Sequence, residues 1–335
     1  MDSNTSDEKN LAEGPDNFKK IESVFGKKLE RKTRIKEKII EVFFALAGSM
    51  ALVFIFLIFF FLFKEGVKAF YHIDPLSFLF AYKYDIHSEF RRVYEWYPTS
   101  EDTRFSLIPL ILGTLVTSIP AVIISSIFGV AAGIYLSEVA NPKVKEFLKP
   151  MIELFAAIPT VVIGFIMLVV GASLVDNFFQ PVNRLNAFVA SLGLSLVIIP
   201  VIASLTEDAL RSIPNDIRMA SYGLGATKWQ TISRVILPAG FSGVSASIIL
   251  GFGRAIGETM IVLMASGNAA NITADIFSSV RTMTATIAAE MGEVSQGSDH
   301  YYALFFIGVV LFVITFVLNL IAEIIISKMR KKNTF

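Results

Sequence analysis

Cysteine is absent from this chain of 335 residues, and histidine occurs only three times. The absence of cysteine excludes disulfides, thiolate chemistry and cysteine-ligated metal sites. The three histidines (His72, His87 and His300) lie in separate polar segments without the spacing of metal ligands. Charged residues make up 18% of the chain and the formal net charge is +1, so no general positive field would attract nucleic acid.

Motifs for nucleotide binding and hydrolysis are missing as well. No G-x4-G-K-[ST] occurs, and the glycine-rich stretch Gly251–Gly257 is one residue off G-x-G-x-x-G and lies within an apolar run. Neither H-E-x-x-H nor G-x-S-x-G is present, and no cluster of carboxylates replaces them. We therefore expect no catalytic residue, no metal and no cofactor in this chain.

Long apolar segments are what the sequence has instead. Hydrophobic residues make up 54% of the chain, far above the share in a soluble domain. As a helix, about 20 apolar residues cross a hydrocarbon core of ~30 Å. Six segments reach that length and predict an all-α polytopic membrane protein with six transmembrane helices. They are Val42–Phe63, Leu107–Leu136, Pro150–Val175, Ala187–Thr206, Val235–Ser266 and Ala303–Ser327.

Composition divides the rest of the chain into tails, loops and a core. We expect a disordered tail (1–26), a basic juxtamembrane helix (27–40), the first transmembrane helix (41–63), an external loop (64–104), a core with the other five spans (105–328) and a short tail (329–335).

The distribution of Lys and Arg predicts the orientation. Twenty-one of these residues lie before the first span, after the sixth span and in the loops 137–149 and 207–234, whereas eight lie in the three opposite loops. By the positive-inside rule, both termini and the loop 207–234 are expected on the cytoplasmic side of the cell membrane.

Between the fifth and sixth spans, apolar residues recur at steps of three and four and predict a one-sided helix on the outer face. These residues are Ile276, Val280, Met283, Ile287, Met291 and Val294. The helix is either an amphipathic surface helix packed on the bundle or a gate. Glu290 and Glu293 within it are expected to be surface charges, and Glu138, at the end of the second span, is expected to be solvated.

The loop 207–238 has the pattern of a folded element. Thr206–Ser212 and Pro214–Tyr222 favour helices, and Ala226–Arg234 favours another that carries Trp229. Gly223 and Gly225 stand between them, at positions that permit positive φ. Two short helices bent around glycines would make a rigid knob suited to a groove in another protein.

This loop resembles the EAA loop of ABC-importer permeases, whose pattern is EAA, three residues, Gly, nine residues and Ile-x-Leu-Pro. Ala220, Gly225 and Val235–Pro238 meet that spacing, whereas Met219 and Ser221 replace the first and third letters. The resemblance implies that the loop docks in a separate ATP-binding subunit. The residues assigned to this docking are Ala220, Ser221, Gly223, Gly225, Trp229, Leu237 and Pro238.

A second stretch, Gly253–Met260 (GRAIGETM), resembles the GRA-x-GETM segment of phosphate-importer permeases, closest to the PstC type. Shorter matches are Leu112–Leu115, Glu153–Gly164 and Phe312–Thr315. The resemblance covers roughly residues 105 to 328 and implies the type I ABC-importer permease architecture.

The same resemblance implies a set of partners. They are two copies of an ATPase that binds ATP and Mg, a second permease subunit, an external phosphate-binding protein, phosphate itself and membrane lipid. The sequence leaves open whether the second permease is PstA-like or another copy of this chain.

Arg254 and Glu258 interrupt the fifth span. On a continuous helix they would share one face, about a turn apart. Charges at membrane depth cost roughly 2.5–3.5 kcal/mol each and usually face a cavity or a partner. The pair is either an internal ion pair that joins helices, or a translocation site in which Arg254 binds phosphate oxygens and Glu258 holds the guanidinium between anions. Gly253 and Gly257 would allow close helix packing.

Glu153, Pro159 and Thr259 are weaker candidates for the pathway. Glu153 would lie in the first turn of the third span, where a helix N-terminus favours a carboxylate, so a structural role is the alternative. Pro159 would kink the same span.

We expect the transmembrane permease subunit of an ATP-driven phosphate importer that works by alternating access. One alternative is a permease for another oxyanion such as sulfate, molybdate or a phosphonate, because an Arg attracts any oxyanion. The other is a secondary transporter driven by an ion gradient. That class predicts inverted repeats and acidic relays at the midplane, and the sequence has neither.

Overall fold

The structure is a computed structural model that describes residues 14–74, 78, 82–84, 90–92, 94–99 and 103–332. The chain divides into two units, Met1–Phe61 and Leu62–Phe335. Six helical stretches in the described residues are long and apolar enough to cross a membrane, which makes this an integral membrane protein. The prediction of an all-α protein with six transmembrane helices is confirmed.

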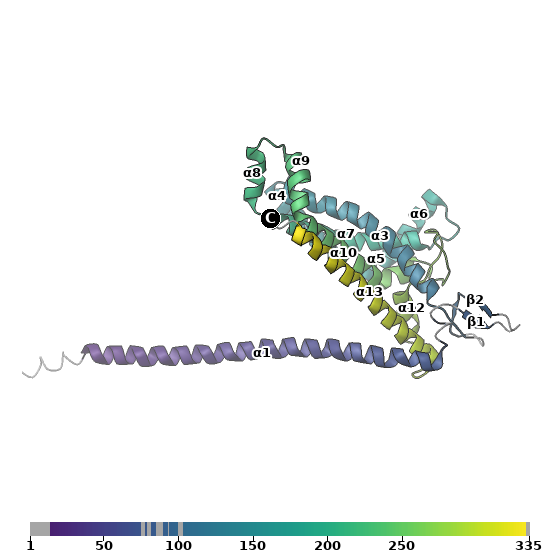
Figure 1. The fold of residues 1–335 in the computed structure, drawn as a ribbon, viewed down its shortest axis with the longest axis horizontal. Coiled ribbons are helices and arrows are strands. Elements are labelled where there is room, and N and C mark those ends of the chain that lie inside the picture. Colours follow the sequence, from purple (N-terminus) through teal and green to yellow (C-terminus); the bar gives the residue numbers. More distant parts are fainter. Residues whose placement is uncertain are drawn as a thin grey trace, which may run out of the picture. The chain divides into compact units, whose positions relative to one another are not determined.

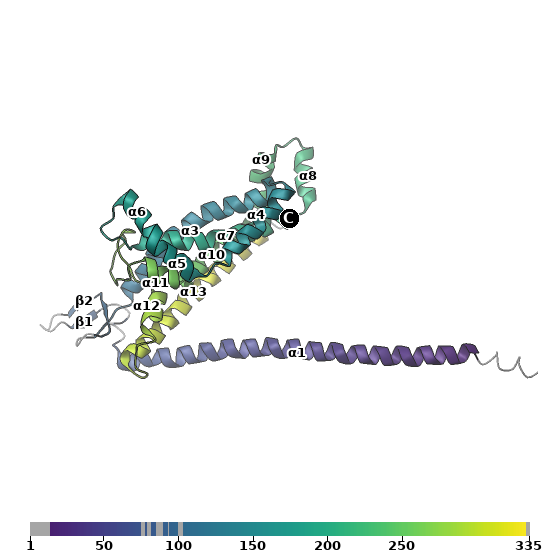
Figure 2. The same ribbon diagram turned by 180° about the vertical axis from the view of Figure 1, so that it is seen from behind.

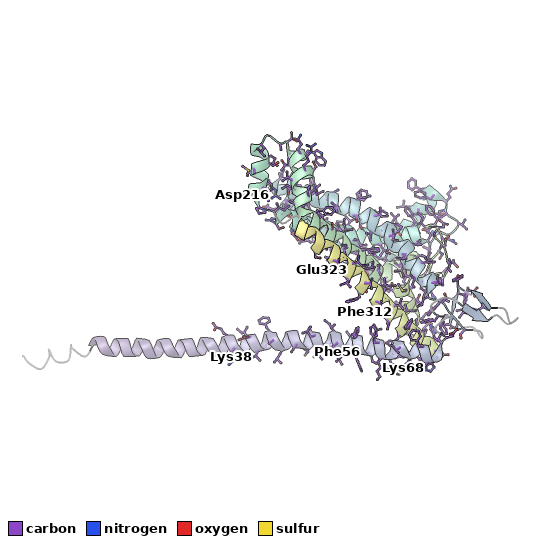
Figure 3. All side chains as sticks on the ribbon, in the orientation of Figure 1. Lys38, Phe56, Lys68, Asp216, Phe312 and Glu323 are labelled. Atoms are coloured by element: carbon purple, nitrogen blue, oxygen red, sulfur yellow. The ribbon has the colours of Figure 1, made fainter. Side chains whose placement is uncertain are left out.

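The described part of the first unit is a single helix, α1 (Gly14–His72), which continues into the second unit. Side chains such as Phe56 project from it without cover, as expected of a helix that faces lipid (Figure 3). Residues 14–26 were predicted to be disordered, but they are helical in the structure. Pro15 suits a first turn, and no proline interrupts the Lys- and Glu-rich stretch that follows. Residues 1–13 lie outside the described residues.

The second unit holds the other five spans. Several contain a π-helical turn, labelled η. The spans are α3–η1 (Ile108–Ile134 and Tyr135–Val139), α5–η2–α6 (Thr160–Ile166, Met167–Gly171 and Ala172–Phe179), α7 (Ala187–Arg211), α9–η3–α10 (Lys228–Thr231, Ile232–Ile236 and Leu237–Gly257) and α13 (Asp299–Lys332).

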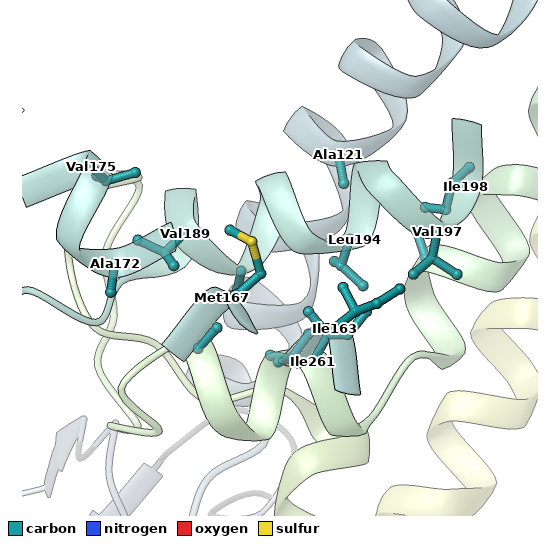
Figure 4. Packing of buried hydrophobic residues seen from close by; sticks show 14 of the residues in the cluster. Ala121, Ile163, Met167, Ala172, Val175, Val189, Leu194, Val197, Ile198 and Ile261 are labelled. Carbon is teal, nitrogen blue, oxygen red and sulfur yellow. The ribbon is translucent and has the colours of Figure 1, made fainter. Parts of the chain in front are cut away.

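Helix α7 is the most buried span and packs against α3, α10 and the short helix α11 (Met260–Ala265). Small residues allow the close approach of α3 and α7. A Cβ atom added at Gly133 would lie 2.6 Å from the Cβ of Thr206 and 2.8 Å from the carbonyl oxygen of Ala203. Around α7, the side chains of Leu194, Met167 and Ile261 fill the core (Figure 4). Helix α10 packs against both members of this pair.

The third span begins later than the sequence predicted. Residues Pro142–Ala156 form a separate helix, α4, whose N-cap Asn141 accepts a hydrogen bond from Val144 N at 2.9 Å. A residue that precedes a proline avoids the α region, so the helix ends before Ile158-Pro159 and the span starts at Thr160. Pro159 therefore precedes the span rather than kinking it.

Short elements cover one end of the second unit, and the loop between α7 and α9 occupies the other (Figures 1 and 2). The strands β1 (Tyr82–Tyr84) and β2 (Phe90–Arg92) pair antiparallel, as do β3 (Trp96–Tyr97) and β4 (Arg104–Phe105). They occupy the part of the chain predicted as an external loop, together with the last turns of α1.

The one-sided helix predicted between the fifth and sixth spans is shorter than expected. Only α12 (Met283–Glu290) is helical in that segment. The residues before it run irregularly because they bind the start of α7, where Ala187 N donates to Ser278 O at 3.0 Å and Phe188 N to Ile276 O at 2.7 Å. The first amide groups of α7 need such partners.

Candidate functional site

The loop between α7 and α10 folds into two short helices, α8 (Asn215–Gly223) and α9, which we call the knob (Asn215–Thr231). Gly225 forms the turn between them with φ of +81°, as predicted. Gly223 does not share this role, because it is the last residue of α8 and its φ is not positive. A capping box then starts α9, in which Thr227 and Gln230 exchange hydrogen bonds.

A polar contact joins the two helices of the knob, and large apolar side chains are exposed on its surface. The hydroxyls of Ser221 and Thr231 lie 2.9 Å apart, and both side chains are buried. Leu224 is 90% exposed and Trp229 is 69% exposed, and Met219 is exposed beside them. Such large apolar side chains on a folded loop indicate a surface that contacts another protein.

The predicted docking residues therefore divide into two groups. Trp229 and Ala220 are exposed, whereas Ser221 is buried and holds α8 to α9. Leu237 and Pro238 lie outside the knob, in the first turn of α10. Sequence reasoning missed Leu224, although its place between two glycines at the tip of the knob was a usable signal.

An ion pair braces the knob against the membrane helices. Arg218 of α8 donates to both carboxylate oxygens of Glu138 in η1, at 2.6 and 3.1 Å, and also to the carbonyl oxygens of Leu210 and Ile213. The Glu138 side chain is only 6% exposed, so the prediction that it is solvated was wrong. The pair is separated by 80 positions in the sequence, which no local pattern reveals.

A second set of ion pairs joins α4 to α7. The carboxylate of Glu207 is fully buried and binds both Lys145 and Lys149. Lys149 also binds Asp208 at 2.8 Å, and these carboxylates raise the pKa of Lys149 above its usual range. These ion pairs therefore hold α4 against the end of α7, the helix that precedes the knob.

Arg254 lies in the last turn of α10, but it is not buried as the sequence suggested. Its neighbours at helical spacing, Leu250 and Gly257, are exposed too, whereas Gly251, Ala255 and Ile256 are buried. A Cβ at Gly257 would meet nothing within 4 Å. The predicted close packing at Gly253 and Gly257 is therefore wrong within this chain, and Gly251 fills that role against α7.

The fifth span is broken just after Arg254, where the sequence predicted a continuous helix. Helix α10 ends at Gly257, and Glu258 has extended backbone angles (φ −73°, ψ 134°). Oε1 of Glu258 accepts hydrogen bonds from the amides of Thr259 and Met260 at 3.1 and 3.2 Å. The carboxylate thus binds the first amides of α11, and in the described residues it forms no ion pair with Arg254.

A hydrogen bond joins this break to the outer segment. The Thr284 hydroxyl of α12 donates to the backbone oxygen of Glu258 at 2.9 Å. Thr259 lies at the same break, next to Glu258, and its role in a pathway stays a prediction. Glu153 does not belong to this group: it is exposed within α4, far from a first turn, so its predicted position at the start of the third span was wrong.

At the other end of the unit, three residues meet at Glu290. Its carboxylate binds Trp96 Nε1 at 3.0 Å, an Arg281 nitrogen at 2.6 Å and His300 Nε2 at 2.8 Å. Burial acts to raise the pKa of Glu290, but these hydrogen bonds and the Arg281 charge hold it below its usual range. The cluster lines a recess of about 670 Å³. The prediction that Glu290 is a surface charge was wrong.

Metal binding has no support in the described residues, where no group of three or more His, Asp or Glu side chains is placed to hold an ion. The structure instead presents three features along the bundle: an exposed knob at one end, a broken helix with an exposed Arg254, and a polar recess at the other end.

Comparison with known proteins agrees with this arrangement. Residues 129–331 match the family described as binding-protein-dependent transport system inner membrane component. The probable ABC transporter permease protein YqgH of Bacillus subtilis is 34% identical over 240 residues, which cover 72% of this chain and 78% of that protein. The phosphate transport system permease protein PstC of Haemophilus influenzae is 33% identical over 255 residues, covering 70% and 80%.

Solved structures show the shared fold. A chain of the MetNI methionine ABC transporter matches with a TM-score of 0.54 at 18% identity, covering 67% of this chain and 95% of that one. A chain of a bacterial alginate ABC transporter matches with a TM-score of 0.54 at 17% identity, covering 83% and 92%.

The structure and the matches together define the class: a bundle of membrane helices with a folded, exposed loop at one end, in a chain similar to transporter permeases. The chain belongs to the binding-protein-dependent transport system inner membrane component family, with the fold of type I ABC-importer permeases. It is an ABC-importer permease subunit.

Proposed function

We propose that this chain forms the translocation pathway of an ATP-driven importer for inorganic phosphate. The observation that carries the choice of substrate is the set of relatives named phosphate transport system permease protein PstC, among them the H. influenzae protein at 33% identity and a Mesorhizobium japonicum protein at 31%. The GRAIGETM stretch, which holds Arg254 and Glu258, supports the same choice.

The knob is the proposed site of coupling. Its apolar tip, with Leu224 and Trp229 exposed, suits a groove in a separate ATPase subunit, of which two copies would serve a pair of permeases. ATP binding would close the ATPases and push the knob. Because Arg218 joins the knob to Glu138 at the end of the second span, that push passes directly to the membrane helices. ATP and Mg would bind in the partner, and no cofactor is proposed for this chain.

Arg254 is the proposed phosphate contact. An exposed guanidinium on a membrane-spanning helix requires an aqueous path or a partner subunit beside it, because lipid does not solvate it. A face of α10 with Leu250, Arg254 and Gly257 exposed suits a pathway that lies between this chain and a second permease subunit. That subunit is either a PstA-like chain or a second copy of this one.

The proposed orientation places the knob and both termini in the cytoplasm and the Glu290 recess outside, as the Lys and Arg distribution indicates. An external phosphate-binding protein would then deliver substrate to the side of the recess.

Reconstitution tests this function. The complex purified with its partners should take up labelled phosphate into vesicles when ATP is present on the knob side. Sulfate, molybdate and a phosphonate serve as competitors, and mass analysis of the complex determines whether the second permease is another copy. Uptake of a competitor in preference to phosphate would identify that anion as the substrate. Uptake driven by an ion gradient without ATP would refute the proposed mechanism.

A further inference from the structure

A recess lies at the base of the knob, distinct from its apolar tip. It has a volume of about 670 Å³ and is lined by side chains of the helices α4, α7, α8 and α9 and of η1. Four of the lining residues are cations, Lys145, Arg211, Arg218 and Lys228, and one, Glu138, is an anion. A concave surface lined by one sign of charge raises the local concentration of the opposite ion.

The cations in the recess are not all neutralised. Arg218 is paired with Glu138, and Lys145 with the buried Glu207, which Lys149 shares. Arg211 approaches Glu207 only at 4.0 Å and is 67% exposed. Lys228 is exposed in the first turn of α9 and forms no ion pair in the described residues. Glu207, Asp208 and Lys149 do not line the recess but form ion pairs next to it. When these three residues are counted with the lining residues, the positive charges still outnumber the negative ones.

We propose that this recess binds a phosphate group, with Arg211 and Lys228 as its principal contacts. Guanidinium and ammonium groups are the side chains that bind phosphate oxygens, and the recess has ample room for a hydrated phosphate group. The source is either the headgroup of an anionic phospholipid or inorganic phosphate. Basic pockets between membrane helices on the cytoplasmic side are typical lipid headgroup sites.

Occupancy has a mechanical consequence for the knob. Lys228 belongs to α9 and Arg211 to the end of α7, so a phosphate group bound by both would join these two elements. It would add to the brace that Arg218 already forms with Glu138. If the source is inorganic phosphate, phosphate that accumulates on this side of the membrane would make the knob more rigid. This inference is independent of which anion the pathway carries.

The test uses the full chain and three variants. Arg211→Gln with Lys228→Gln removes both principal contacts. Lys228→Gln alone removes one contact and still gives a result if the double variant does not fold. Lys143→Gln is the matched control, because Lys143 is an exposed cation of α4 that does not line the recess. Circular dichroism and thermal unfolding without phosphate verify that each variant is folded.

Two measurements distinguish the sources. Sodium phosphate, compared with sodium chloride at equal ionic strength, should raise the unfolding temperature of the detergent-purified chain if inorganic phosphate binds. Native mass spectrometry after extraction from nanodiscs of phosphatidylcholine and phosphatidylglycerol should show retained phosphatidylglycerol if a lipid headgroup binds. In either case the double variant should weaken the response about tenfold or more, and Lys143→Gln should not.

The outcomes separate clearly. A response to phosphate or to phosphatidylglycerol that the double variant loses, and that Lys228→Gln reduces, supports the site and names its ligand. A response that persists in the double variant assigns binding elsewhere, for example to Arg254, and overturns the proposal. Equal losses in the double variant and in Lys143→Gln would mean general charge attraction, and no response to either probe would also overturn it.

Discussion

The guanidinium of Arg218 lies 2.6 Å from one carboxylate oxygen of Glu138 and 3.1 Å from the other, which joins the knob to the end of the second membrane span. The two side chains are 14% and 6% exposed, so this is a buried ion pair. A buried pair is costly to break from one side because the remaining charge is left without a partner.

Replacement of Arg218 by Ala should therefore destabilise the knob by about 3 kcal/mol. The amides of α8 should lose protection in hydrogen exchange, while those of α3 and α7 should keep theirs. Replacing both partners, Arg218→Met with Glu138→Leu, should recover much of the loss, since no unpaired charge remains. The control is Arg234→Ala, at an exposed position, which should change stability by less than about 0.5 kcal/mol. Equal protection in Arg218→Ala and Arg234→Ala would mean that the pair does not brace the knob.

Gly225 and Gly223 form a matched pair for testing the turn. A Cβ at either position meets nothing within 4 Å, but only Gly225 has positive φ. Gly225→Val should therefore cost about 1–2 kcal/mol through backbone strain alone. Gly223→Ala, in α8, should be neutral or stabilise by up to about 1 kcal/mol. The expected result in the reconstituted complex is weak ATPase binding or uncoupled ATP hydrolysis for Gly225→Val, and normal uptake for Gly223→Ala. Normal uptake by both would count against the knob as the coupling element.

Features that depend on neighbours in the sequence were predictable. Apolar length indicated the membrane spans, and Gly225 between two helical patterns indicated the knob and its turn. The spans were misplaced where apolar composition continues across a backbone break. Apolar sequence continues on both sides of Ile158-Pro159 and of Glu258-Thr259. Composition alone therefore did not separate α4 from α5 or α10 from α11.

Features that depend on distant residues were not predictable. Trp96 and Glu290 are 194 positions apart, and Arg218 and Glu138 are 80 apart. Glu138 and Glu290 were each predicted to be exposed from their own segments. The burial of their charges follows only from how α3, α8 and α12 pack. Arg254 was expected to be buried because the surrounding sequence is apolar. It is exposed instead, because no other part of the described chain packs on its face of α10.

The Glu290 cluster predicts a pH dependence of stability. The pKa of Glu290 is held below its ordinary value of 4.5 in the folded protein, so its bonds to Trp96, Arg281 and His300 stabilise the fold above that pH. Stability should fall as the pH drops below about 4.5, toward the lowered folded pKa, because protonation removes the charge that these donors bind. Glu290→Gln should lower the unfolding temperature at pH 7 and flatten its decline in acid. Glu293→Gln, at an exposed position in the same recess, is the control and should leave the wild-type profile unchanged.

The same acidic decline in wild type and Glu290→Gln would assign the pH dependence to other carboxylates. A loss of stability in Glu293→Gln equal to that in Glu290→Gln would mean that the recess responds to total charge rather than to the bonded cluster.

Arg254 gives the sharpest test of the transport pathway. Arg254→Lys keeps the positive charge but loses the two-pronged hydrogen-bonding geometry, so phosphate uptake should fall about tenfold or more while the complex still assembles. Because Glu258 binds the amides of Thr259 and Met260 and not Arg254, exchanging the charges (Arg254→Glu with Glu258→Arg) should not restore uptake. Labelled phosphate uptake in vesicles and the mass of the purified complex measure both results. Near-normal uptake by the exchanged variant would mean that the two charges form a structural pair in the assembled transporter, and it would assign the anion path to other residues.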